Sequence, residues 1–207
     1  MDLDKLSEKI NPQTTALLIT DMQRDYCCAG GVIDKMGFDF EVAKRLAPRL
    51  NDFVDRARKI LKYIVHIKMA HIPELASPVL KEHYERVGLQ REYNPSFSEF
   101  YGIKPMDGEI VVPKYRYSAF VSTYLDKYLR ANSIKTLVLT GVATNVCVES
   151  TARDGFMLDY HIVVASDLTE ATETGAKQWS LRNIETFFGE VVNSRNLLDC
   201  WGLQGEL

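Results

Sequence analysis

Cys147 stands at a position where a cysteine could act as a nucleophile. It follows an apolar run over residues 136–139 and lies at the start of a helix-like run. Backbone N–H groups at the start of a helix lack intrahelical partners, and the helix dipole favours negative charge there. Both effects predict a thiol pKa below the free value of about 8.5, and the same N–H groups could bind an oxyanion. A buried structural cysteine would also fit this position, because free cysteines are often buried.

Two other residues with catalytic potential lie at the ends of predicted strands. Asp21 ends an apolar run that begins at residue 16, and Lys114 ends the run 109–114. Taken singly, the aspartate could cap a turn and the lysine could be a solvated charge. In parallel sheets, however, ligands bind at the carboxyl ends of the strands, where residues distant in sequence meet. We therefore expect Asp21, Lys114 and Cys147 to converge in one crevice.

Apolar runs and amphipathic patterns alternate along the chain, which is typical of parallel α/β proteins. Strands are predicted at residues 16–21, 63–67, 109–114, 136–140, 161–167 and 190–193. Helices are predicted at residues 41–61, 122–131, 145–158 and 172–187. Pro48 marks a kink or a later start in the first of these helices. We predict a three-layer α-β-α sandwich around a mostly parallel, Rossmann-like six-stranded sheet with strand order 3-2-1-4-5-6.

Residues 70–108 form the one long irregular stretch of the sequence. The stretch contains four prolines and several aromatic residues, and it allows a short helix near residues 79–86. Connections of this length usually act as active-site lids or binding loops. We therefore expect residues 70–108 to line or cover the pocket.

Length and composition narrow the class of protein. The 207 residues fit one domain spanning 1–207, and a hydrophobic content of 46% suffices for a sizeable core. The net charge is −3 and no basic stripe is interleaved with aromatics, so nucleic-acid binding is not expected. No apolar run of about 18 residues predicts a membrane span, and the polar N-terminus does not resemble a secretory signal. We expect a cytoplasmic protein with reduced thiols, since the cysteine spacing matches no disulfide or zinc framework; the cysteines are Cys27, Cys28, Cys147 and Cys200.

Three sequence motifs carry a family resemblance. They read DMQRDY at residues 21–26, KYRYSAF at 114–120 and GVATNVC at 141–147, the last followed by STARD at 150–154. In this order they resemble the isochorismatase-like cysteine hydrolase superfamily, over nearly the whole chain from residue 16 to residue 188. Within that superfamily the chain looks most like ureidoacrylate amidohydrolases, and it is also similar to N-carbamoylsarcosine amidases.

The resemblance implies a role for each residue at the strand ends. Cys147 would be the nucleophile, Asp21 the general base and Lys114 the third member of a catalytic triad. The backbone N–H groups of Ala143 and Cys147 would form the oxyanion hole. Family members have a cis peptide in this loop, which maps here to the bond between Val142 and Ala143. In the family, this bond directs an N–H group at the oxyanion.

The implied activity is that of a cysteine-dependent amidohydrolase acting on non-peptide C–N bonds. Such an enzyme cleaves a small carbamoyl, ureido or carboxamide compound through a thioester and releases ammonia or an amine, and it needs no cofactor. Tyr26 and Tyr117 match aromatic positions of the ureidoacrylate enzymes and could contact the substrate, although half-buried packing explains a tyrosine equally well. Family members commonly assemble, so a homo-oligomer, either a dimer or a tetramer, is expected.

A metal site is not expected. Nicotinamidases of this superfamily bind a divalent ion through an aspartate and histidines that follow the second strand. In the matching stretch, residues 66–71, Met69 takes the place of the aspartate and only His71 aligns with a ligand. Zinc normally needs three or four ligands. His66 fits a histidine packed within a strand.

Several alternative functions deserve comparison with an amidohydrolase. A nicotinamidase-type hydrolase is disfavoured by the missing metal ligands. True isochorismatases, which cleave a vinyl ether, usually lack the cysteine. A non-catalytic or redox-responsive binding protein on the same scaffold would lack a member of the triad, whereas all three are present here. A dinucleotide-dependent enzyme would need a glycine-rich turn after the first strand, and residues 21–25 (DMQRD) do not form one.

Overall fold

The strands form one parallel sheet. In the computed structural model, which describes residues 3–70, 72, 75, 77–88 and 94–203, the described strands make a six-stranded sheet in the order β3-β2-β1-β4-β5-β6. Every adjacent pair in it is parallel. The bounds are β1 Thr15–Thr20, β2 Tyr63–Met69, β3 Ile110–Lys114, β4 Thr136–Val142, β5 His161–Glu170 and β6 Glu190–Val192. The predicted strand order and the parallel sheet are thereby confirmed.

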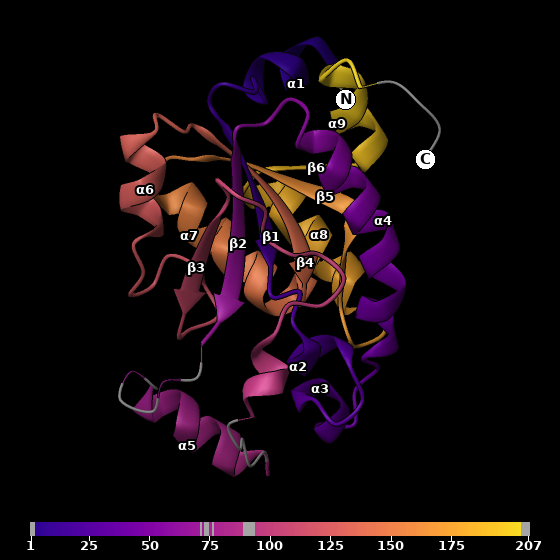
Figure 1. Cartoon of the computed structure of the whole chain (residues 1–207), viewed down its shortest axis with the longest axis vertical. Helices are drawn as coiled ribbons and strands as arrows, with labels where there is room; N and C mark the ends of the chain where they lie inside the picture. Colours follow the sequence, from indigo (N-terminus) through magenta and orange to yellow (C-terminus); the bar gives the residue numbers. More distant parts are fainter. Residues whose placement is uncertain (1–2, 71, 73–74, 76, 89–93, 204–207) are drawn as a thin grey trace.

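Helices cover both faces of the sheet (Figure 1). One face carries α1 (Leu3–Lys9), α4 (Glu41–Ala57) and α9 (Ser194–Cys200), and the other carries α6 (Leu125–Ala131), α7 (Glu149–Met157) and α8 (Ala176–Phe187). Side chains of β1 alternate between the two layers, as the pleat of a strand requires. Leu17 and Ile19 pack on the α4 side, whereas Ala16 and Leu18 pack on the α7 side. The predicted three-layer architecture is therefore confirmed.

The helix α4 is amphipathic. Its apolar side chains recur every three or four residues and are buried against the sheet. Pro48 lies on the exposed face, and α4 continues through it from Glu41, which corrects the alternative of a later helix start. Proline removes one N–H donor there and its ring crowds the carbonyl four residues earlier, and the packing of the buried face offsets this cost. Within the described ranges, no helix is both long and apolar enough to cross a membrane.

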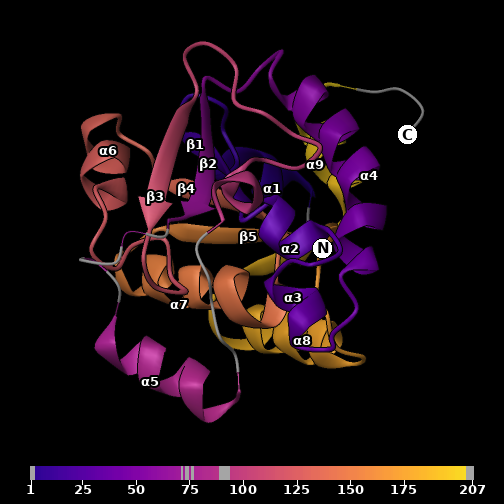
Figure 2. The same cartoon turned by 60° about the horizontal axis from the view of Figure 1, so that its bottom comes forward.

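Several segments gather beyond the carboxyl ends of the strands. These are α2 (Arg24–Cys27), α3 (Val32–Lys35) and α5 (Pro78–Arg86), whereas α1 and α9 lie at the opposite end of the sheet (Figure 1). Figure 2 turns this end forward and shows α5 well apart from α2 and α3. No residue of α5 is buried, and its first turn is capped by Ser77, whose Oγ accepts from the Leu80 N–H at 3.2 Å.

The predicted lid, residues 70–108, is only partly described. Besides α5 it contains a short 3₁₀ helix, η2 (Pro95–Ser98), which leads back towards the sheet. Residues 71, 73–74, 76 and 89–93 lie outside the described part of the chain. The role of this segment as a lid or pocket wall stays a prediction.

The strands β4 and β5 extend beyond their predicted ends because their pairing shifts register. Regular pairing stops after Leu139 and resumes with Gly141 opposite Thr169. Asp167, where the sequence pattern predicted the end of the strand, lies in the irregular stretch. Its carboxylate accepts from the N–H of Ser194 at 2.8 Å and from the Ser194 hydroxyl at 2.6 Å. The polar residue that interrupts the apolar pattern is therefore accommodated at the start of α9, and β5 continues.

Gly141 lies against the backbone of β1. Its φ is +95°, and a Cβ added there would stand 2.1 Å from the carbonyl oxygen of Thr20 and 2.7 Å from its nitrogen. Both distances are far inside van der Waals contact, so no side chain fits unless the two central strands separate. Asp21 follows Thr20 directly, so this close approach also fixes the backbone from which the Asp21 side chain extends.

We expect Gly141→Ala to lower the free energy of unfolding by at least twice as much as Gly108→Ala. Gly108 has nearly the same φ, +90°, but nothing lies within 4 Å of an added Cβ. The control should therefore show only the cost of a left-handed backbone, about 1–2 kcal/mol, whereas Gly141→Ala adds a clash with backbone atoms. Urea unfolding followed by circular dichroism measures both values. Equal losses in the two variants would contradict this explanation.

Candidate active site

A buried ion pair joins the ends of β1 and β3. The Lys114 Nζ lies 2.8 Å from the Asp21 Oδ2, and the two side chains are 0% and 1% exposed. The ammonium also donates to the carbonyls of Tyr117 (2.8 Å) and Arg116 (3.2 Å), so the chain after β3 folds back onto the lysine. Asp21 has a φ of +51°, in the left-handed region that residues other than glycine rarely adopt. Each charge stays buried only because the other is beside it.

Cys147 lies beside both charges, on the element that follows β4. The Asp21 carboxylate and the Lys114 ammonium both act directly on the pKa of its thiol. The strands β1 and β4 are neighbours in the sheet, with Gly141 opposite Thr20, so backbone pairing brings the segment before Cys147 next to Asp21. The structure thus brings together the three residues that were expected to converge.

The segment that leads to Cys147 differs from the predicted helix. The peptide bond between Val142 and Ala143 is cis, at the position that the family resemblance gave. A π-helix, η3, then spans Thr144–Val148, and α7 begins only at Glu149. The single helix predicted over residues 145–158 is therefore wrong in its first turn, because the wider π turn and the α-helix share the same pattern of apolar residues.

The start of this π-helix is held by two hydrogen bonds to one backbone carbonyl. The N–H groups of Val148 and Val146 both donate to the carbonyl of Ala143, at 3.2 and 3.1 Å. The first N–H groups of a helix lack acceptors in the regular pattern, and Cys147 lies in this first turn. An oxyanion-binding role for the Cys147 N–H fits this position and stays a prediction.

Burial raises the pKa of the Cys147 thiol to about 12; the Lys114 ammonium lowers this pKa, and the Asp21 carboxylate raises it. The expectation of a lowered pKa is therefore wrong, because removing the sulfur from water outweighs the helix start and the ammonium. Burial lowers the pKa of Lys114, but Asp21 and Cys147 raise it by more, so the lysine stays a cation. The resting site combines a neutral thiol with an ion pair.

Gln23 connects the 70–108 segment to the end of the sheet where Asp21 lies. Its fully buried side-chain amide donates to the carbonyls of Met69 (3.1 Å) and Ser98 (3.3 Å), and its oxygen accepts from the Met69 N–H at 2.8 Å. These bonds hold the end of β2 and the last part of the segment next to Asp21. Sequence reasoning missed this role, and the only available signal was the position of Gln23 two residues after the candidate base.

Thr151 connects the Cys147 segment with the loop after Lys114. Its hydroxyl donates to the carbonyl of Cys147 at 2.7 Å and accepts from the N–H of Ala119 at 3.1 Å. Sequence reasoning missed this link as well, although Thr151 belongs to the motif at 150–154 that supports the family resemblance. The hydroxyl helps to fix the distance between the sulfur and the ammonium.

The two tyrosines expected near the substrate are half-buried. Tyr26 of α2 packs against the apolar cluster around α4, and the carbonyl of Tyr117 accepts from Lys114. Cys27 is buried in the same cluster as Tyr26, and burial raises the pKa of its thiol, whereas Cys28 is half-buried. Substrate binding by either tyrosine stays a prediction.

His66, in the middle of β2, binds a carboxylate of the protein. Its Nε2 lies 2.7 Å from Glu109 Oε2, and Arg58 donates to the same carboxylate through Nε (2.7 Å) and Nη2 (3.0 Å). Burial raises the pKa of Glu109, but Arg58, the Met106 N–H and His66 lower it by more, to about 2. Among the described residues, no three or more His, Cys, Asp or Glu side chains group to hold a metal ion, and His71 lies outside them.

The fold and this site place the chain in a known class. The isochorismatase domain matches residues 15–196, a range that contains Asp21, Lys114 and Cys147. The chain therefore belongs to the isochorismatase family, as its three motifs indicated.

Individual relatives add detail. Ureidoacrylate amidohydrolase RutB of Klebsiella pneumoniae subsp. pneumoniae is 39% identical over 197 aligned residues, covering 87% of this chain and 84% of that protein. An isochorismatase family protein from Desulfovibrio vulgaris matches with a TM-score of 0.77 and 28% identity, over 91% of this chain and 98% of that one. The N-carbamoylsarcosine amidase from Thermoplasma acidophilum matches with a TM-score of 0.69 and 26% identity, over 87% and 96%. These relationships confirm the expected family and support the expected enzyme class, a hydrolase of C–N bonds.

The raised pKa predicts how Cys147 reacts with an alkylating reagent. Only the thiolate reacts, so the rate with iodoacetamide should rise about tenfold per pH unit from about pH 7 to pH 10 without levelling off. Peptide-resolved mass spectrometry after quenching measures the rate at Cys147. Asp21→Asn is the matched variant, because it removes a charge that raises the thiol pKa, and its Cys147 should react faster at the same pH. A plateau below about pH 8 in the wild type would contradict a neutral resting thiol.

Proposed function

We propose that the protein is a cysteine-dependent amidohydrolase that cleaves a C–N bond of a small carbamoyl, ureido or carboxamide compound. The observation that carries the proposal is the buried Asp21–Lys114 ion pair with the Cys147 thiol beside it, where both charges act on its pKa. A nucleophile, a base and a fixed cation within hydrogen-bonding reach are what attack on a poor electrophile needs. The similarity to ureidoacrylate amidohydrolase and N-carbamoylsarcosine amidase favours a ureido or N-carbamoyl substrate.

In this proposal, acylation starts from the neutral thiol. As the Cys147 sulfur attacks the carbonyl carbon, its proton moves to Asp21, the C–S bond forms and the π-electrons pass to the carbonyl oxygen. Coupled transfer avoids a free buried thiolate, which burial disfavours. Lys114 remains charged and stabilises the negative charge that develops beside it. The N–H groups of Ala143 and Cys147 bind the oxyanion, and one such donor contributes about 3–4 kcal/mol.

The second half of the cycle releases both products. Collapse of the tetrahedral intermediate breaks the C–N bond, and the nitrogen takes the proton from Asp21 and leaves as ammonia or an amine. Asp21, again a carboxylate, accepts a proton from the water molecule that attacks the thioester on Cys147. The second intermediate expels the sulfur, which recovers its proton from Asp21. Carbamate formed from a ureido substrate breaks down to carbon dioxide and ammonia.

An ammonia-release screen tests the proposal. Wild-type protein is incubated with ureidoacrylate-type compounds, N-carbamoyl amino acids, biuret-type compounds and nicotinamide. We expect turnover of a carbamoyl or ureido compound, and a loss of about 10³-fold or more in Cys147→Ala, because the covalent route is removed. Turnover retained by Cys147→Ala would overturn the nucleophile, and turnover of nicotinamide alone would overturn the ureido class.

Two controls separate loss of chemistry from loss of fold. Cys200→Ala removes a half-buried thiol whose Sγ lies 3.7 Å from the carbonyl of Leu3, at the opposite end of the sheet, and it should keep full activity. The urea unfolding curve of Cys147→Ala should retain the cooperative transition of the wild type. Mass spectrometry of acid-quenched wild-type protein should show the acyl or carbamoyl adduct on Cys147, and an adduct on another residue would contradict the mechanism.

A further inference from the structure

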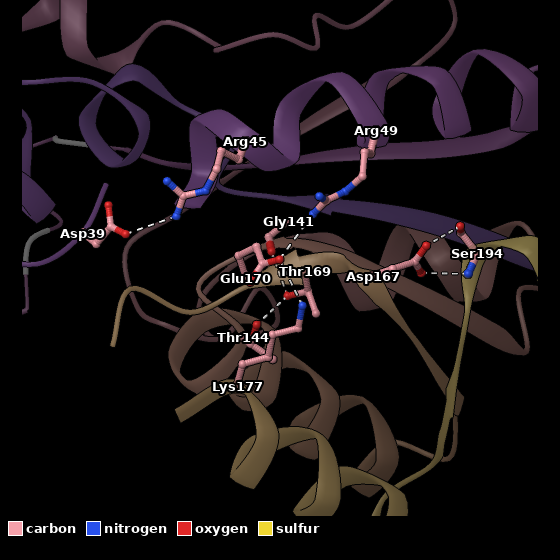
Figure 3. A network of polar contacts seen from close by, with 10 residues as sticks. All are labelled: Asp39, Arg45, Arg49, Gly141, Thr144, Asp167, Thr169, Glu170, Lys177 and Ser194. Carbon is pink, nitrogen blue, oxygen red and sulfur yellow. Dashed lines mark hydrogen bonds and ion pairs between the residues drawn. The ribbon is translucent and has the colours of Figure 1, made fainter. Parts of the chain in front are cut away.

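Two buried hydroxyl groups form a hydrogen-bonded chain next to the Val142–Ala143 peptide (Figure 3). The Thr169 Oγ1 donates to the carbonyl of Gly141 at 2.8 Å and lies 2.9 Å from the Thr144 Oγ1. Both threonines are 0% exposed. Thr169 stands opposite Gly141 because the register between β4 and β5 shifts just before this pair.

The number of hydrogens determines the direction of both bonds. A carbonyl oxygen only accepts, so the single hydroxyl hydrogen of Thr169 is used on Gly141. The bond between the two hydroxyls must then be donated by Thr144. The chain therefore runs from Thr144 through Thr169 to Gly141, and Thr169 is both the acceptor and the donor at its centre.

This hydroxyl chain spans the short loop that contains Ala143. Gly141 and Thr144 stand on either side of the loop, so the chain ties its two ends together. The Ser180 hydroxyl of α8 donates to the carbonyl of Thr144 at 3.1 Å and fixes the loop from outside. The carbonyl of Ala143 accepts from the Val148 N–H at 3.2 Å, which fixes the loop to the π-helix.

We propose that Thr169 and Thr144 are positioning residues for hydrolysis: they hold the loop from Gly141 to Thr144 so that the Ala143 N–H points at the oxyanion. The inference rests on the proposed function, which makes this N–H an oxyanion donor. Both hydroxyls act through the loop and bond to protein groups, so neither needs to touch the substrate. Because a displacement of about 1 Å can cost about 10²-fold in rate, the loss of this tie should affect acyl transfer strongly.

Two reagents that react with the same sulfur distinguish positioning from a general structural effect. p-Nitrophenyl acetate acylates a cysteine through a tetrahedral oxyanion, so its rate depends on the oxyanion hole. Iodoacetamide alkylates the sulfur by displacement at a methylene carbon and forms no oxyanion. Because alkylation depends on the thiolate fraction and on access to the sulfur, an unchanged alkylation rate shows that neither has changed. A fall in acylation alone then reports on the oxyanion hole.

Thr169→Val removes the central hydroxyl at nearly constant volume. We expect its acylation rate to fall about 10- to 100-fold while its alkylation rate stays within about twofold of the wild type. Thr169→Ser keeps the hydroxyl and should restore most of the acylation rate. Thr136→Val is the matched control, because the buried Thr136 hydroxyl also donates to a backbone carbonyl, that of Lys9, but at the opposite end of β4. It should leave both rates unchanged.

The outcomes also separate this inference from the proposed function. A wild-type protein that is not acylated at Cys147 would overturn the proposed function and, with it, the inference. Normal wild-type acylation that is unchanged in Thr169→Val, or a fall of both rates together, would overturn only the positioning role. If urea unfolding shows that Thr169→Val does not fold, Thr144→Val gives the same readout, because it breaks the chain at its first bond. An unchanged rate ratio in that variant would overturn the proposal as well.

Discussion

The buried pair of Asp21 and Lys114 is the interaction on which the candidate site depends. Removing either charge from water alone would cost several kcal/mol, and the replacement of such a pair by apolar side chains is often neutral or even stabilising. Stability is therefore a poor explanation for a pair whose side chains are 0% and 1% exposed. The proposed chemistry is a better explanation, because it uses the pair as a proton acceptor whose charge is balanced in place. The parallel sheet supplies two strand ends at one edge and excludes water from both.

The same burial determines the resting protonation state of Cys147. The effects of Lys114 and Asp21 on the pKa of Cys147 oppose each other, so the exclusion of water decides its direction. In the proposed mechanism, the sulfur keeps its proton until a carbonyl group is in place to receive the electron pair. A protonated thiol is also a poor target for oxidants and alkylating agents, because these react with the thiolate. Under the proposed mechanism, this arrangement protects Cys147 between turnovers.

Local signals in the sequence were sufficient for the sheet and for the reactive residues, because Asp21 and Lys114 directly end apolar runs. The helices α1, α2, α3 and α9 were missed because four to seven residues show no clear periodicity. The roles of Gln23 and Thr169 were missed for another reason, because each role depends on contacts with residues distant in sequence. Gln23 bonds to residues 46 and 75 positions away, and Thr169 lies beyond the polar residues that seemed to end its strand. The raised pKa of Cys147 is likewise a product of tertiary burial.

Unlike the helices that cover the sheet, α5 contributes nothing to the core. It buries none of its residues, and the segment that follows is held by main-chain hydrogen bonds from Arg24 N–H to the Glu99 carbonyl and from Tyr101 N–H to the Met22 carbonyl. These bonds do not depend on which side chains α5 carries. Substitutions in α5 therefore alter the surface beyond the strand ends at little cost to the sheet that holds the reacting groups. The outer surface of this plan can therefore vary in one helix while the residues at the strand ends stay in place.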